Sequence, residues 1–87
     1  MTESKVTSLE QIKPGNKVRI VYREDWQRIA HIIAIIDGDT VLWCYLAKTK
    51  RRWEYKIEHM HFFRSYMKSD DLFHLGKSEK TFSVVSE

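Results

Sequence analysis

The stretch that decides the fold is IIDGDTVLWCYLAKTKRRWEYKI, residues 35–57. Asp37-Gly38 is a strong signal for a tight hairpin turn, because both residues tolerate the positive φ angles of such turns. The flanking segments, 28–37 and 40–48, are rich in the β-branched and aromatic residues that favour strands. A second polar reversal leads into residues 52–57, where apolar and charged side chains alternate. The stretch therefore predicts a meander of consecutive strands.

Two more strands extend this meander. Residues 17–23 alternate apolar and basic side chains after a Pro-Gly-Asn turn, and residues 61–66 form a short aromatic run that fits a fifth strand. Residues 69–76 begin with a capping serine followed by acids and end near a glycine, which is typical of a helix of one or two turns. Residues 80–87 fit either a last strand or a frayed tail.

These elements predict a small all-β fold, an SH3-like five-stranded barrel with a short C-terminal helical appendage, since closing a sheet removes its exposed edges. We expect an N-terminal arm and turn over residues 1–16 and the barrel over 17–67. Residues 68–87 then form a C-terminal helix and tail that pack on or near the barrel. A chain of 87 residues is long enough for one domain and too short for two.

The composition is that of a globular protein in a reducing compartment. Apolar residues make up 43% of the chain, which is too many for a disordered segment. The single cysteine, Cys44, has neither a disulfide partner nor a second metal ligand beside it. The N-terminus has no apolar leader and no run approaches membrane-spanning length, so we expect a cytoplasmic protein without a membrane partner. The net charge of +3 mildly favours anionic partners.

Three segments resemble the WYL domain, a small SH3/Sm-like β-barrel. They are VRIVYR (18–23), DGDTVLWCYLAK (37–48) and RWEYKIEHMHFFRSY (52–66), and the resemblance covers about residues 17–66. After the turn, Thr40, Val41 and Leu42 stand where the family has Trp-Tyr-Leu. The resemblance implies a regulatory module that binds nucleic acid or a small, often nucleotide-like, anion.

A basic cluster is the main candidate binding surface. Phosphate groups are bound by lysine and arginine side chains, and nearby rings can stack on bases. The candidate ligand or nucleic-acid site consists of Arg19, Lys48, Lys50, Arg51, Arg52 and Lys56. If Arg19 faces solvent, it can form one stripe with Arg52 and Lys56. The alternative is a solvated hairpin in which Glu54 and Glu58 pair with these charges.

The aromatic residues of the cluster follow the strand alternation. Trp53 and Tyr55 fall on the same face as Ile57, so we expect their rings to pack in the core. Farther back, Arg28 stands two residues from Trp26, where a cation–π contact can form.

Catalysis and metal binding have little support in the sequence. His59 and His61 form a His-x-His pair that could chelate zinc, but no further ligand stands at a metal-site spacing. No nucleophile with a base, glycine-rich phosphate loop or buried acid pair can be argued. We therefore expect a non-enzymatic protein without a metal or cofactor.

A second interpretation is a protein-interaction module. Phe62, Phe63 and Tyr66 lie in one short segment, and a strand can bury only alternate side chains against one core. The remaining aromatic surface could bind a protein partner or a second copy of the chain. The chain would then act as a docking protein or a small inhibitor, of the kind that a phage or mobile element encodes.

Overall fold

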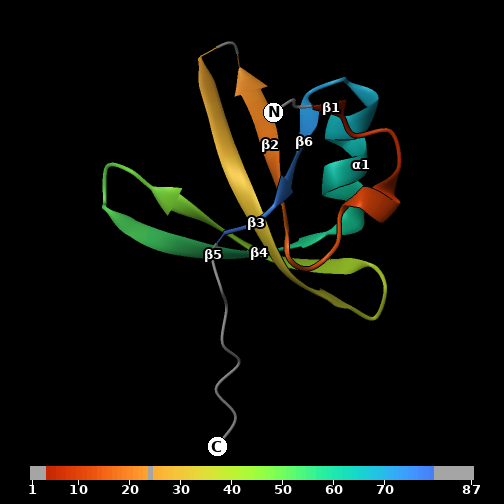
Figure 1. The fold of residues 1–87 in the computed structure, drawn as a ribbon, viewed down its shortest axis with the longest axis horizontal. Helices are drawn as coiled ribbons and strands as arrows, with labels where there is room; N and C mark the ends of the chain where they lie inside the picture. The colour runs from red at the N-terminus through yellow and green to blue at the C-terminus, as the bar shows by residue number, and fades with distance from the viewer. Residues whose placement is uncertain (1–3, 24, 80–87) are drawn as a thin grey trace, which may run out of the picture.

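A computed structural model gives the fold and describes residues 4–23 and 25–79 (Figure 1). In chain order the elements are β1 (Ser4–Lys5), the 3-10 helix η1 (Leu9–Gln11), β2 (Asn16–Arg23), β3 (Trp26–Ile36), β4 (Thr40–Ala47), β5 (Arg52–His59), α1 (Met60–Lys68) and β6 (Leu72–Lys77). All strands belong to one antiparallel sheet of order β1-β6-β2-β3-β4-β5. The predicted small all-β fold with one short helix is confirmed. None of the helices in the described residues is long and apolar enough to cross a lipid bilayer.

The sheet is strongly curled because β3 takes part in both of its halves. Residues 26–31 of β3 pair with β2, and residues 31–36 pair with β4. The register shifts between Ile32 and Ala34, and such a bulge bends a strand and increases its twist. In Figure 1 the β4–β5 hairpin accordingly swings away from β2 and β6. The last strand of the described residues, β6, returns to the side of β2, which leaves β1 and β5 as the two edges of this six-stranded sheet.

Two turns follow the chemistry of their residues. Asp37 and Gly38 have φ angles of 54° and 78°, and these positive values are those of a type I′ hairpin turn. Gly15, with φ at 91°, turns the chain into β2, where its amide donates to the carbonyl of Ile32 at 3.0 Å. The predicted Asp-Gly hairpin and Pro-Gly-Asn turn are both confirmed.

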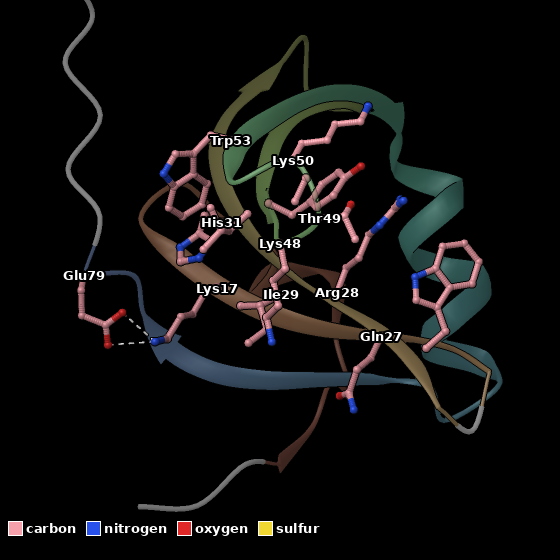
Figure 2. A pocket seen from close by; sticks show the side chains of 14 residues that line it. Lys17, Gln27, Arg28, Ile29, His31, Lys48, Thr49, Lys50, Trp53 and Glu79 are labelled. Atoms are coloured by element: carbon pink, nitrogen blue, oxygen red, sulfur yellow. Dashed lines mark hydrogen bonds and ion pairs between the residues drawn. The ribbon is translucent and has the colours of Figure 1, made fainter.

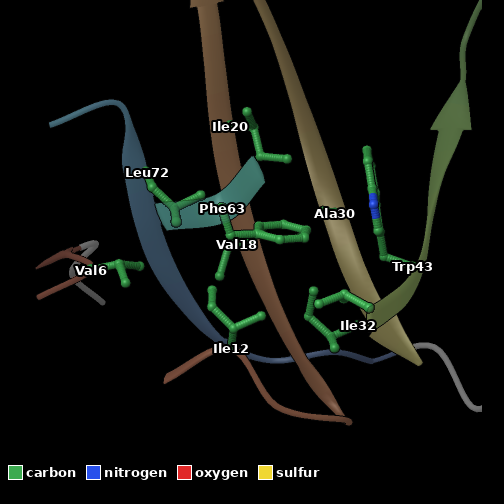
Figure 3. Packing of buried hydrophobic residues seen from close by; sticks show 10 residues of the cluster. Val6, Ile12, Val18, Ile20, Ala30, Ile32, Trp43, Phe63 and Leu72 are labelled. Atoms are coloured by element: carbon green, nitrogen blue, oxygen red, sulfur yellow. The ribbon is translucent and has the colours of Figure 1, made fainter. Parts of the chain in front are cut away.

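The core lies between the curled sheet and α1 (Figure 3). Phe63 points from the helix into its centre and is fully buried, and its ring meets Trp43 edge-on at 6.0 Å between centroids. The other fully buried apolar side chains of this cluster come from the sheet: Val18, Ile20, Ala30, Ile32, Val41, Trp43 and Leu72. The helix thus covers the face that the sheet alone would leave open.

The predicted strand over residues 61–66 is wrong, because this segment lies within α1. Met60, Phe63 and Met67 recur at spacings of three and four residues, which places them on one side of a helix. The helix is capped by His59, whose Nδ1 accepts a hydrogen bond from the amide of His61 at 3.1 Å. One run of apolar residues therefore suits either element, and the need to cover the core selects the helix.

The predicted helix over residues 69–76 is also wrong. Its capping serine and acids lie in the turn after α1, where Asp70 has a φ of 61°. The rest of the segment is β6, which pairs with β2 and buries Leu72 completely. The short helix α1 therefore precedes strand β6, and residues 69–77 carry a turn and this strand. The prediction for residues 80–87 lies outside the described residues.

The central position of Phe63 gives the first prediction. Phe63→Ala should lower the free energy of unfolding by about 3–5 kcal/mol, because it removes a buried ring and leaves a cavity. Urea unfolding followed by the fluorescence of the buried Trp43 measures this change. Ile36→Ala is the control, since the Ile36 side chain is 43% exposed and should cost no more than about 1 kcal/mol. Equal losses in the two variants would contradict the assigned core.

Candidate functional site

A pocket of about 650 Å³ opens between β2, β3 and the turn that joins β4 to β5 (Figure 2). It is lined by Lys17, Trp26, Gln27, Arg28, Ile29, His31, Tyr45, Leu46, Ala47, Lys48, Thr49, Lys50, Trp53 and Glu79. A volume of this size is typical of sites for small molecules. The curl of the sheet creates the pocket, because it brings the tip of the β4–β5 hairpin over the first half of β3.

One end of the pocket is built around Arg28. Its guanidinium carbon lies 4.1 Å from the ring centroid of Tyr45, 5.2 Å from that of Trp26 and 5.3 Å from that of Tyr22. Burial raises the pKa of the Tyr22 phenol, and a hydrogen bond with Arg28 opposes this shift. The predicted contact between Arg28 and Trp26 is confirmed. These three rings fix the position of the Arg28 guanidinium by cation–π contacts, and such contacts leave its positive charge unneutralised.

The opposite end is formed by Lys17, Glu79, His31 and Trp53 (Figure 2). Lys17 Nζ contacts the two carboxylate oxygens of Glu79 at 2.7 and 2.8 Å, and this hydrogen-bonded pair lowers the pKa of Glu79. The ring of Trp53 meets that of His31 edge-on at 5.1 Å, and His31 Nδ1 lies 2.6 Å from Ser78 Oγ. These contacts fix the orientation of Trp53.

The hairpin tip supplies the third side of the pocket. Lys48, Thr49 and Lys50 line it and are all exposed, while Arg51 follows with a φ of 54°. A left-handed conformation at a residue other than glycine costs about 1 kcal/mol, and such strain is often found at functional sites.

Positive charge dominates the lining. Lys17, Arg28, Lys48 and Lys50 are cationic, and Glu79 is the single acid among the described residues that line the pocket. Lys17 neutralises Glu79, and the contact of Lys50 with Glu54 is 3.8 Å long. Within the described part of the chain, no acidic side chain forms an ion pair with Arg28 or Lys48. The pocket therefore presents a net positive potential between aromatic rings.

The structure brings four of the six predicted binding residues together. Lys48, Lys50, Arg51 and Arg52 all lie at or next to the hairpin tip and are exposed. Arg19 lies on β2, where its Nη1 donates to Gln27 Oε1 at 2.6 Å. Gln27 lines the pocket, so Arg19 contacts a pocket residue without lining the pocket itself.

Lys56 lies farther along β5 than this group, and it lies on the opposite face of the sheet from Arg19. It lies opposite Trp43, on the core side of the sheet, whereas Arg19 shares the outer face with Ile29 and His31. A stripe of Arg19, Arg52 and Lys56 on one face is therefore wrong. Arg19 and Lys56 lie on opposite faces and on strands that are not neighbours.

The predicted core packing of Trp53 and Tyr55 is wrong as well. Tyr55 is 58% exposed and Ile57 is 65% exposed, while Trp53 is half-buried in the pocket wall. The reason is the register with β4, since Tyr55 lies opposite Cys44 and Lys56 lies opposite the buried Trp43. A shift of one residue reverses the two faces of a strand, and this register turns the aromatic face of β5 outward.

The predicted aromatic partner surface is largely internal. Phe63 is fully buried and so is not available to a partner. Phe62 and Tyr66 are partly buried and pack against the core cluster, with 5.1 Å between their ring centroids. The helical arrangement of this segment accounts for the difference, because it directs the three rings toward the sheet.

His59 and His61 form a stacked pair at the start of α1, with 4.4 Å between ring centroids. His59 Nδ1 is engaged by the amide of His61, and Nε2 lies 3.7 Å from Asp39. Within residues 4–23 and 25–79, no three histidine, cysteine or acidic side chains are grouped so that they could hold a metal ion.

Sequence reasoning did not assign Tyr45, His31 or Ile29 to a site. These residues belong to strands whose composition predicts only a sheet, and they line a pocket because the sheet bends. The proximity of Trp26 and Arg28 was the one local signal of this end of the pocket.

No protein-family model matches the chain, and no curated protein or solved structure matches it. The resemblance to the WYL domain therefore stays a prediction.

The hairpin tip gives the second prediction. Arg52 Nε lies 2.7 Å from Glu54 Oε2, and this hydrogen bond lowers the pKa of Glu54. Arg52→Gln should raise the pKa of Glu54 toward its ordinary value, as followed by NMR of the side-chain carboxyl during a pH titration. Because the folded pKa is depressed, the pair stabilises the fold above the ordinary carboxyl pKa. That contribution is lost as the pH falls through the folded pKa.

Arg51→Gln is the matched control, since Arg51 makes no contact that shifts Glu54. It should leave the pKa of Glu54 unchanged. A similar rise in both variants would mean that the general positive charge of the tip, and not the Arg52 hydrogen bond, sets this pKa.

Proposed function

We propose that this protein is a non-enzymatic binding module that recognises nucleic acid, or a small nucleotide-like anion, through the pocket. The carrying observation is that Arg28 and Lys48, which form no ion pair with an acidic side chain of the described residues, line the same pocket as Trp26, Tyr45 and Trp53. A base stacks on an aromatic ring while the adjacent phosphate contacts a cation, and the shared chemistry of the proposed ligands is this pair of groups.

The arrangement favours unpaired bases over a duplex. The rings lie within a pocket, so a base must leave its stack to reach them. Lys48 and Lys50 line the pocket, and Arg51 and Arg52 follow them at the exposed hairpin tip, so this tip can contact phosphates on either side of the bound base. Single-stranded nucleic acid is therefore the preferred ligand in this proposal, and its selectivity comes from stacking and charge.

Binding, rather than catalysis, fits the charges of the pocket. Its acid, Glu79, is held by Lys17, and the pKa of Glu79 is lowered rather than raised toward neutrality. The resemblance to the WYL domain points to the same ligand class and to a regulatory role. A cytoplasmic location agrees with Cys44, the single cysteine of the chain, which is buried.

The third prediction tests this function by fluorescence. Trp26 and Trp53 line the pocket and should be quenched by a single-stranded oligonucleotide, whereas Trp43 is buried and reports on folding. If about three phosphates are contacted, affinity should fall by roughly twentyfold between about 50 and 200 mM salt. A duplex of the same sequence should bind more weakly.

Two variants separate the contributions. Lys48→Gln should reduce the slope of log affinity against log salt by about 0.7, the value for one phosphate of a single strand. Lys68→Gln is the matched control, because Lys68 is an exposed lysine at the end of α1 and does not line the pocket. A folded protein whose emission does not change with any oligonucleotide, or equal effects of both variants, would refute the proposal.

A further inference from the structure

Strand β5 has an open edge. It is the last strand of the sheet and pairs only with β4 among the described residues (Figure 1). Thr40 lies opposite His59, and the next amide, that of Met60, donates to the carbonyl of Asp39 at 2.7 Å. Hydrogen-bonded and non-bonded pairs alternate along an antiparallel ladder. The backbone groups of Trp53, Tyr55 and Ile57 therefore point away from β4, toward this edge.

The same three residues present an apolar row on the outer face of the sheet. Tyr55 and Ile57 are more than half exposed, and Trp53 is the half-buried member next to the pocket. A regular strand edge beside exposed apolar side chains favours pairing with another strand. The charged row of β5, on the opposite face, determines which strand can pair with it.

The charges of β5 are complementary to themselves. From Arg52 to Glu58 the strand reads RWEYKIE, and rotation end for end about Tyr55 exchanges basic with acidic positions. Two antiparallel copies centred on Tyr55 place Arg52 opposite the partner's Glu58 and Lys56 opposite the partner's Glu54. Trp53 then lies opposite the partner's Ile57. Opposite charges and apolar pairs facing each other across strands both stabilise a sheet.

Compared with the two registers that are shifted by two residues toward either end, only the register centred on Tyr55 has that property. A shift of two residues toward either end places Glu54 opposite itself or Lys56 opposite itself. Each shifted register also sets Arg52 against the partner's Lys56, or Glu54 against the partner's Glu58. Like charges directly opposite each other are destabilising, so the charge pattern favours the alignment centred on Tyr55 over these two neighbouring registers.

We propose that two copies of this chain associate through antiparallel pairing of their β5 strands, with Tyr55 on the two-fold axis. The contact is isologous, so it closes at two copies and does not propagate. The outer faces of the two sheets then lie on the same side of the dimer. Because Trp53 belongs to the pocket and faces the partner's Ile57, each pocket is bordered by the other copy.

The two-fold axis at Tyr55 can be tested by cross-linking. Hydrogen-bonded antiparallel pairs have Cα atoms about 5.5 Å apart, which suits a disulfide. Tyr55→Cys should therefore form a disulfide-linked dimer under mild oxidation, as seen on a non-reducing gel. Ile57→Cys is the control, because its two copies would lie about 13 Å apart along the strands. The native Cys44 is buried and should not compete.

The charge pattern can be tested by sedimentation equilibrium of the full chain. Lys56→Glu places an acid opposite the partner's Glu54 at two symmetric positions of the dimer and should weaken association by about tenfold or more. Glu54→Lys combined with Lys56→Glu restores opposite charges and should recover most of the affinity. Lys68→Glu changes the net charge equally on exposed α1 and should leave association unchanged. Circular dichroism checks that each variant is folded.

Several outcomes would overturn the dimer. They are a native chain that stays monomeric up to about 1 mM, equal cross-linking at positions 55 and 57, and a double variant no better than Lys56→Glu. Neither Glu54 nor Lys56 lines the pocket. Oligonucleotide binding by a monomeric Lys56→Glu variant would therefore support the proposed function separately, and loss of oligonucleotide binding alone would leave the dimer standing.

Discussion

The structure depends on one strand that belongs to both halves of the sheet. Strand β3 pairs with β2 through residues 26–31 and with β4 through residues 31–36, and its register shift near Ile33 redirects the chain between them. Without this bend the sheet would be flat, α1 could not cover it, and the hairpin tip would lie far from Arg28. Core, helix position and pocket are thus consequences of the same backbone feature.

The sequence predicted the elements whose signals are local. The alternation in 17–23, the apolar run before Asp37-Gly38 and the regular pattern of 52–57 all became strands. The errors fell between residues 60 and 77, where a helix and a strand were exchanged. The segment after His59 contains apolar residues at both the helical and the strand spacing. It becomes a helix because its rings then contact Trp43 and the rest of the core. That contact joins residues distant in the chain, so no local pattern reveals it.

The site was predictable only in part, for a similar reason. A cluster of lysines and arginines at a hairpin tip is visible in the sequence, and the structure keeps it together. The pocket beneath it is not visible, because Arg28, Tyr45 and Trp53 meet through the curvature of the sheet. The outward orientation of Tyr55 depends on its pairing with Cys44, since the alternation of β5 alone suits either face. The alternation shows which residues share a face of the strand, and the register with the neighbouring strand determines which of the two faces packs against the core.

The position of the last strand has a consequence for how the chain reaches its native state. Strand β6 lies between β1 and β2, so Val18 pairs with His74 across most of the chain. Closing so long a loop has a large entropic cost before its contacts form, and proteins rich in such distant contacts fold slowly. During synthesis, the meander from β2 to β5 can assemble as soon as it emerges. The second edge of β2 stays unpaired until residue 77 has left the ribosome and β6 can form. Only then can β1 pair with β6.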